Sequence, residues 1–463
     1  MVSGYGGVPM AIQLMDTTIF GPIFDSESKA IFDEDGVVES WLLFEKTLAR
    51  VEGELGIIPK HLAEEIYRKA NLSEVSLERI SKYFLETGLA SMALIKALRD
   101  ACSTDAGEYI HYGATTQDLY DTSLAIRLKK FMSLLIRNLK DVRDLLVELA
   151  TRYKNTVMIG RTHGTHAIPI TFGFKLAILA ETFATHLIRA HEIYPRITVG
   201  SLSGAVGTFS SFKAISNVNP LEIEERVLEE LGLYSPVISI QPTIERFCEF
   251  LNFLSLISMT AEKLAQDFFT LQRQEISEIK EPPLSSSDIS SSTMPHKQNP
   301  KVCESIIGFS KLIRSYGHAL METPMKDERD RSPFWVEDIA MPQACILTIT
   351  ILNSMKKILE GLEVFPKTME KNVDLTKGLI MSENIMLKIT KKTGKKQSAH
   401  EWVSRAAQKA SKEMLPFEEV LLRDEQIRKY LSSQEIREAL NASKYLGIAD
   451  ELVERVSKLL KDS

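Results

Sequence analysis

The stretch ATTQDLYDTSLAIRLKKFMSLLIRNLKDVRDLLVELATRYKN (Ala114–Asn155) contains neither glycine nor proline, and the same holds as far as Ile159. Apolar side chains recur in it with a near-heptad rhythm, at Leu124, Leu128, Phe131, Leu135, Val142, Leu146 and Leu149. Such spacing places them on one face of a helix. A helix of roughly 35 residues is about 50 Å long at 1.5 Å per residue. Because helices of that length are rare in compact globules, the stretch predicts a helix bundle, often one completed by other subunits.

The rest of the chain is also predicted to be helical, since alternating strand patterns are almost absent. Apolar residues spaced three and four apart from Val37 to Leu55 indicate a helix with charges on its opposite face. A second run without glycine or proline extends from Thr243 to Glu281. Further helices are predicted near 302–322, 334–360, 367–393 and 398–413.

The composition is that of a soluble globular protein. Of the 463 residues, 44% are hydrophobic and 25% charged, and the net charge of −6 argues against a nucleic-acid partner. Four scattered cysteines without a CxxC pair indicate reduced thiols in a cytoplasmic protein. The first residues lack the basic and apolar regions of a signal peptide. The longest uncharged stretch, Ile339–Met355, is interpreted as a buried helix, so no membrane segment is expected.

Polar motifs interrupt the helical pattern at three places. These are HYGATTQD (111–118), MIGRTHGTHAIPITFG (158–173) and SSSDISSSTMPHKQNP (285–300). The second, interpreted as a loop because it carries glycines and a proline, holds a cation, hydroxyls and an imidazole close together. That set suits an anionic substrate and a proton transfer. His163 and His166 form an HxxH pair, but no third ligand is nearby, so we expect no metal site.

The serine tract of the third motif has two interpretations. Composition alone favours a disordered linker. The residues that follow do not suit a linker, because Met294-Pro295 fixes the chain, and Lys297 and Asn299 alternate just before a new helix. A flexible segment that ends in an anion-binding turn is typical of a catalytic lid.

SSTMPHKQNP resembles the signature loop of the fumarase/aspartase superfamily: Ser291, Met294, Lys297 and Asn299 match, and Ser290 replaces the usual glycine. HYGATTQDLYDT, GRTHGTHAIPITFG, SGAVGTF and FPKTMEKNVDLTKGLIMSE resemble blocks of its branch of adenylosuccinate lyases and carboxymuconate cycloisomerases, in order along nearly the whole chain. The resemblance implies an all-α fold of three domains, at 1–113, 114–366 and 367–463. It also implies a long central helix bundle that forms a 20-helix core in a homotetramer, with active sites shared between subunits.

The reaction implied by the resemblance is a β-elimination that needs no metal and no organic cofactor. Ser291 corresponds to the general base, with Ser292 as the alternative, and His163 to the general acid. The substrate-binding residues implied for a small dicarboxylate are Thr115, Thr116, Gln117, Thr162, Gln241, Lys297, Asn299 and Arg329.

The substrate stays open because the chain departs from adenylosuccinate lyases at three places. It lacks their Arg-Tyr pair in 18–32 and their second histidine in 86–98, and acidic residues with Trp335 replace the phosphate-binding Ser and Arg in 331–342. One hypothesis is a C–N lyase that releases fumarate from a succinyl-type dicarboxylate, adenylosuccinate included. The alternative is a 3-carboxy-cis,cis-muconate cycloisomerase that opens or closes a lactone. A non-catalytic structural homologue is the third, but it predicts loss of Ser291, His163 or Lys297, and all three are present.

Overall fold

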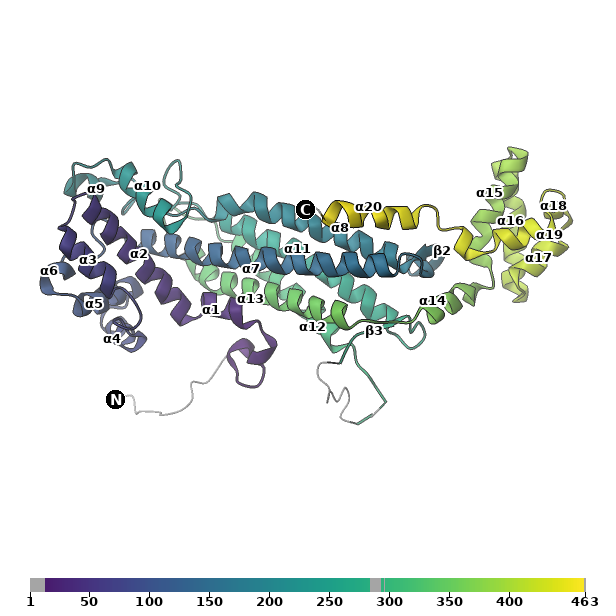
Figure 1. The fold of residues 1–463 in the computed structure, drawn as a ribbon, viewed down its shortest axis with the longest axis horizontal. Helices are drawn as coiled ribbons and strands as arrows, with labels where there is room; N and C mark the ends of the chain where they lie inside the picture. Colours follow the sequence, from purple (N-terminus) through teal and green to yellow (C-terminus); the bar gives the residue numbers. More distant parts are fainter. Residues whose placement is uncertain (1–12, 284–292, 295, 462–463) are drawn as a thin grey trace. The chain divides into compact units, whose positions relative to one another are not determined.

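The computed structural model describes residues 13–283, 293–294 and 296–461 (Figure 1). Within these residues it contains 20 α-helices and two sheets of two strands each, which confirms the all-helical prediction. The chain divides into two compact units. Unit 1 comprises Met1–Leu139, His186–Met259 and Gly308–Asn353, and unit 2 comprises Lys140–Thr185, Thr260–Ile307 and Ser354–Ser463. The three domain boundaries expected from the resemblance stay a prediction.

The predicted long helix is α7 (Thr116–Arg152), and four other long helices accompany it. All seven near-heptad side chains of α7 are buried, as the spacing predicted. By length and composition α13 (Ser332–Gly361) could cross a membrane, but 67% of its apolar window is buried inside the structure, which fits a core helix. The other long helices are α8 (Phe172–Ile197), α11 (Glu245–Leu271), α12 (Lys301–Met321) and α13 (Ser332–Gly361).

Two predicted helices differ from the structure, because one ends earlier than expected and the other is divided in two. The run from Thr243 stops as α11 at Leu271, and its last residues form β3 (Ile279–Lys280), which pairs with β4 (Glu363–Val364). The stretch 367–393 forms two helices, α14 (Pro366–Val373) and α15 (Ser382–Thr393). Between them Lys377 and Gly378 adopt left-handed φ angles of 50° and 90°, a conformation that ends a helix.

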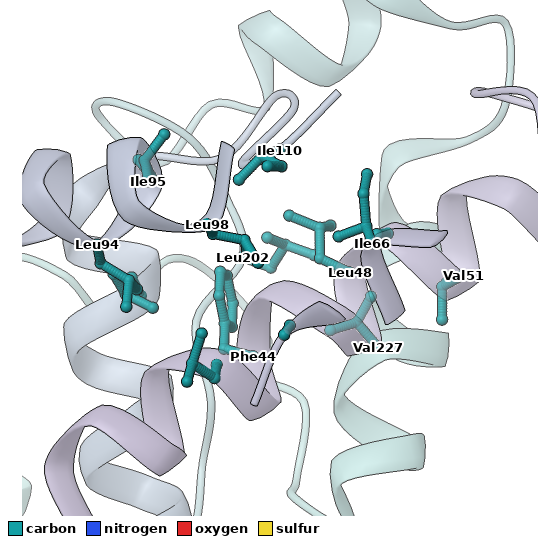
Figure 2. Close-up of a cluster of buried hydrophobic side chains, with 14 of the residues drawn as sticks. Phe44, Leu48, Val51, Ile66, Leu94, Ile95, Leu98, Ile110, Leu202 and Val227 are labelled. Carbon is teal, nitrogen blue, oxygen red and sulfur yellow. The ribbon is translucent and has the colours of Figure 1, made fainter. Parts of the chain in front are cut away.

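The core of unit 1 lies among its short helices and the first turns of α7. Figure 2 shows Phe44, Leu48 and Val51 of α2 (Glu34–Glu54) with side chains of α3 (Lys60–Lys69), α5 (Ala90–Ala101) and α10 (Pro220–Leu231) in one buried cluster. The α2 residues belong to the apolar stripe predicted between Val37 and Leu55. Unit 1 also contains α1 (Ser26–Phe32), α4 (Leu77–Thr87), α6 (Thr104–Gly107) and α9 (Ser210–Ile215).

Unit 2 contains a β-hairpin and a separate helical core. Ile385, Ile389, Phe417 and Leu421 belong to that core and are fully buried. The hairpin pairs β1 (Val157–Thr162) with β2 (Thr165–Thr171) in antiparallel register, where the sequence had been interpreted as a loop. The remaining helices are α16 (Lys396–Glu413), α17 (Phe417–Arg423), α18 (Glu425–Arg428), α19 (Ser433–Ala439) and α20 (Ala449–Lys461).

Two leucine-to-alanine substitutions in unit 1 test the placement of its core. Leu48 is 1% exposed and Leu85 is 85% exposed. We expect Leu48→Ala to lower the free energy of unfolding by about 2–5 kcal/mol, because it leaves a cavity. Leu85→Ala should change it by no more than about 0.5 kcal/mol. Urea titrations of both variants measure the difference, and equal losses would contradict the assigned core.

Candidate active site

Asp118, in the first turn of α7, is the centre of a buried hydrogen-bond network in unit 1. Its Oδ1 atom accepts hydrogen bonds from the backbone nitrogen of Ser203 (2.9 Å) and the hydroxyl of Ser201 (3.2 Å). Its Oδ2 atom accepts from the backbone nitrogens of Thr115 and Gly204, both at 3.0 Å. Burial raises the pKa of the Asp118 carboxyl, and these hydrogen bonds oppose the rise. The network joins the start of α7 to the glycine-rich turn that contains Ser201 and Gly204.

The network continues through Gln241 to Arg329, two of the predicted substrate-binding residues. The Gln241 side-chain nitrogen donates to Asp118 Oδ1 at 2.8 Å and to the carbonyl oxygen of Gly204 at 3.1 Å. The Gln241 carbonyl oxygen accepts from Arg329 Nη1 at 3.2 Å. Asp118 therefore fixes which end of the Gln241 amide faces Arg329.

A pocket of about 710 Å³ in unit 1 brings predicted residues together. Thr116, Gln117 and Arg329 all line it. The Thr116 hydroxyl forms a hydrogen bond of 3.0 Å with that of Ser91, and the Gln117 nitrogen donates to Asp121 Oδ1 at 2.7 Å. The aromatic part of the wall consists of Phe32, Trp41, Phe84, Tyr120, Phe334 and Trp335.

The part of the pocket wall that contains Arg331, Glu337 and Asp338 carries charges of both signs. Arg331 lies over the Trp335 ring, 4.8 Å from its centroid, and donates to Asp338 Oδ2 at 2.7 Å. Glu337 lines the same wall, and burial raises its pKa to about 8. Burial likewise lowers the pKa of Arg127 to about 10, although Glu337 and Asp338 oppose that shift. Arg331 is thus already paired with an acid of the same wall, and Arg127 interacts electrostatically with Glu337 and Asp338.

In unit 2, His163 lies at the tip of the β1–β2 hairpin. Thr162 pairs with Thr165, so His163 and Gly164 form a two-residue turn, with φ angles of 52° and 74°. Two consecutive positive φ angles are those of a type I′ turn, whose twist suits a hairpin. Thr162 and His163 are exposed there. The short turn and the β-branched residues on both sides explain why the predicted loop is a hairpin.

A buried ion pair holds the base of this turn. Arg161 donates through both terminal nitrogens to Glu278, at 3.1 and 2.7 Å, and Glu278 is fully buried. Asn372 of α14 donates to the same carboxylate at 2.9 Å. Ile159 of β1 packs in a small core with residues of α14 and the turns that follow it. The backbone that carries His163 is therefore fixed by contacts within unit 2.

The described end of the signature loop precedes α12. Lys297 is exposed and Asn299 is partly buried. Glu281 accepts hydrogen bonds from the backbone nitrogens of Val302 (2.9 Å) and Cys303 (3.1 Å), and so caps the N-terminus of α12. Ser291 and Ser292 lie outside the described residues, and the role of Ser291 stays a prediction.

The predicted residues therefore fall into two sets. Unit 1 gathers Thr116, Gln117, Gln241 and Arg329 around one pocket, with the Thr115 backbone bound to Asp118. Unit 2 holds Thr162, His163, Lys297 and Asn299. The sequence analysis missed Asp118, although Thr115 and Asp118 have the spacing of a capping box, the signal that would have indicated it. Among the described residues, no three His, Cys, Asp or Glu side chains are grouped as metal ligands would be.

Comparison with known proteins decides the family. Residues 30–314 match the family model described as Lyase, and residues 378–456 match the one described as Adenylosuccinate lyase C-terminus. The adenylosuccinate lyase of Methanocaldococcus jannaschii is 38% identical over 458 residues, which are 98% of this chain and 97% of that protein. The chain belongs to the fumarase/aspartase superfamily of lyases.

Two further relatives of this lyase differ in the activity that they are named for. The N-acetyl-S-(2-succino)cysteine lyase of Dickeya dadantii is 37% identical over 96% of this chain and 97% of its own length. The 3-carboxy-cis,cis-muconate lactonizing enzyme of Pseudomonas putida has a crystal structure that matches with a TM-score of 0.87 at 28% identity, over 95% of this chain and 98% of that one. The predictions of a superfamily lyase and of its fold are confirmed.

Removal of the Asp118 carboxylate tests the centre of the unit 1 network. Asp118→Ala leaves several buried donors without their acceptor, each at a cost of about 1–3 kcal/mol. We expect the free energy of unfolding to fall by at least about 3 kcal/mol. The control is Asp338→Ala, because that side chain is 52% exposed and such an ion pair contributes about 0–1 kcal/mol. Chemical denaturation measures both, and similar losses would contradict the assigned network.

Proposed function

We propose that this lyase releases fumarate from a succinyl-type dicarboxylate by a cofactor-free β-elimination in the cytoplasm. The observation that carries the proposal is the pocket of unit 1, where Thr116, Gln117 and Arg329 meet. A hydroxyl, an amide and a guanidinium are the groups that bind a carboxylate. The exposed histidine at a rigid turn in unit 2 supplies the second requirement, a group that transfers a proton.

The proposed reaction has two bond changes. Ser291 removes a proton from the carbon beside one substrate carboxylate, and the electron pair forms the new double bond. The bond from the adjacent carbon to the leaving heteroatom breaks, and His163 donates the proton that the leaving group takes. Charge accumulates on the carboxylate next to the deprotonated carbon, so positive charge and hydrogen-bond donors there lower the barrier. Lys297 and Asn299 are assigned to that carboxylate, and Thr116 and Gln117 to the other.

We further propose a homotetramer in which each active site combines residues from different copies of the chain. Several apolar side chains on the long helices are exposed in the single chain, which supports burial between subunits. In unit 1 these are Ile188, Leu256, Met259 and Ile339, which are between 41% and 59% exposed.

The substrate proposed is free of phosphate. A phosphate needs several donors to offset the loss of its hydration. Arg331 is already bound to Asp338 and stacked on Trp335, so the Asp338 carboxylate offsets its charge. The compound in the name of the Dickeya relative, N-acetyl-S-(2-succino)cysteine, carries its succinyl group on sulfur and contains no phosphate. A succinyl adduct of that kind, with nitrogen or sulfur as the leaving atom, suits the pocket better than adenylosuccinate.

A cycloisomerase activity is the second candidate. The similarity to the Pseudomonas lactonizing enzyme, together with the sequence at 86–98 and 331–342, favours it. That reaction also moves a proton next to a carboxylate, but it opens or closes a lactone and releases no fumarate. An ultraviolet assay for fumarate, run over succinyl adducts and carboxymuconate, separates the two activities.

Replacement of the proposed base tests the reaction. Ser291→Ala should leave folding and assembly intact and reduce fumarate release by several orders of magnitude, because the substrate proton then has no acceptor. The matched control is Ser292→Ala, which should retain most activity. The opposite pattern would move the base to Ser292.

The assembly is tested in solution. Static light scattering of the active protein should give a mass of about four chains, since a closed oligomer buries the exposed apolar faces. An active monomer would contradict both the tetramer and the shared active site.

The pocket chemistry predicts the order of substrates. We expect the kcat/KM for adenylosuccinate to lie below that for phosphate-free succinyl adducts, because Arg331 is already paired with Asp338 and Arg329 is taken by a carboxylate. Steady-state kinetics over the panel measures the order. A value for adenylosuccinate of roughly 10⁴ M⁻¹s⁻¹ or above would show an efficient phosphate site and contradict the prediction.

A further inference from the structure

Behind the Gln117 amide lies a buried carboxyl group that the proposed reaction does not use. Asp121 Oδ1 accepts the hydrogen bond from Gln117 Nε2 at 2.7 Å, and both residues line the unit 1 pocket. Asp121 Oδ2 lies 3.9 Å from Arg246 Nη2, with both side chains almost fully enclosed. Asp121 is therefore in direct contact with a carboxylate-binding residue on one side and faces a buried cation on the other.

That cation is shared between two acids. Arg246 on α11 interacts electrostatically with Asp121 and with Glu337 of α13. None of the three Arg246 guanidinium nitrogens has a hydrogen-bond partner among the described residues, and Glu337 Oε2 is buried without one as well. Two buried carboxyl groups that share one cation do not both ionise easily, so the cluster retains a proton that its members share.

The charges around Asp121 decide when it takes up a proton of its own. Burial is the main cause that raises its pKa to about 6, and Asp118 adds to the rise. Arg246 and Arg329 oppose it, and Glu337 faces Asp121 from α13. Because the pKa of Asp121 is raised to about 6 in the folded protein, the carboxyl is protonated below about pH 6 and ionised above it.

The charge of Asp121 controls the Gln117 amide. An ionised carboxylate only accepts hydrogen bonds, so the Gln117 nitrogen faces an ionised Asp121. The Gln117 oxygen then points towards the ligand. A protonated Asp121 donates its O–H to the Gln117 oxygen, which turns the NH₂ group towards the ligand. An NH₂ group binds a carboxylate, whereas the amide oxygen repels it. A bound dianion also repels an ionised Asp121, so both effects favour the protonated form.

We infer that a dicarboxylate binds in the unit 1 pocket together with one proton, which Asp121 takes up as the positioning residue for Gln117. The inference rests on the proposed function, because it takes Gln117 to be a carboxylate ligand. It adds that the affinity for substrate and product falls as the pH rises above neutrality, while each residue that contacts the ligand stays in place.

Calorimetric titration of the full-length protein with fumarate tests this inference. Fumarate is a suitable probe because it remains a dianion from pH 6 to pH 8. Titrations in two buffers with different ionisation enthalpies count the protons taken up. We expect proton uptake on binding and a Kd that increases with pH, with a slope that approaches about tenfold per unit, the value for one linked proton.

Three variants assign that proton to a residue. Asp121→Asn still accepts the Gln117 hydrogen bond but takes up no proton, so its Kd should be independent of pH. Asp338→Asn makes the same charge change in the same pocket wall, and it should keep the wild-type slope. His163→Gln removes the proposed proton donor of unit 2, and it should keep the slope as well.

The outcomes separate this inference from the proposed function. Binding without proton uptake in the wild-type protein overturns the inference alone, and that result needs no variant. A slope that persists in Asp121→Asn, or one that disappears in His163→Gln, also overturns it. Absence of fumarate binding at millimolar concentrations overturns the proposed function and the inference together.

Discussion

The carboxylate of Asp118 determines where the polar groups of the unit 1 pocket lie. It is fully buried and accepts hydrogen bonds from three backbone nitrogens, a serine hydroxyl and the Gln241 amide. These donors come from the start of α7, from the glycine-rich turn and from the segment before α11. One charge therefore holds three distant stretches of the chain together. Through Gln241 the same charge orients Arg329, so the side of the pocket proposed to bind a carboxylate depends on a residue that need not contact the ligand.

Unit 2 fixes its functional group in a different way. His163 is positioned by the backbone, since the two positive φ angles of a short turn set the direction in which it leaves the hairpin. The bidentate pair of Arg161 with Glu278 then holds the strand that leads into the turn. The backbone of so short a turn has little conformational freedom, so the point from which the His163 side chain leaves it is fixed. That arrangement suits a proton donor, which acts only when it is held at the right distance.

The sequence predicted the helices well where apolar spacing was regular and uninterrupted. All seven near-heptad residues of α7 are buried, and α12, α13 and α16 match their predicted ranges within a few residues. The hairpin at 157–171 was missed because its glycines and proline suggested a loop, and only the pairing of its two strands reveals it. Asp118 was missed although its spacing from Thr115 suits a capping box, because its other partners are up to 123 residues away in the chain.

The site itself was predicted through the resemblance more than through periodicity. Three of the residues that the resemblance implies, Thr116, Gln117 and Arg329, line one pocket, and their roles stay a prediction. The pairing of Arg331 with Asp338, and the buried cluster of Asp121, Arg246 and Glu337, depend on side chains that α7, α11 and α13 bring together. Such contacts follow from packing and are not visible in a linear sequence.

In the proposed assembly, each active site needs the residues of unit 1 from one chain and the residues of unit 2 from another. Mixing two inactive variants tests it most directly. Chains with Gln117→Ala and chains with His163→Gln are denatured together in equal amounts, refolded and assayed for fumarate release. We expect recovery of about a quarter of the wild-type activity, because random assembly supplies both intact residues to about one site in four. Mixed assemblies that form but remain as inactive as either parent would contradict it.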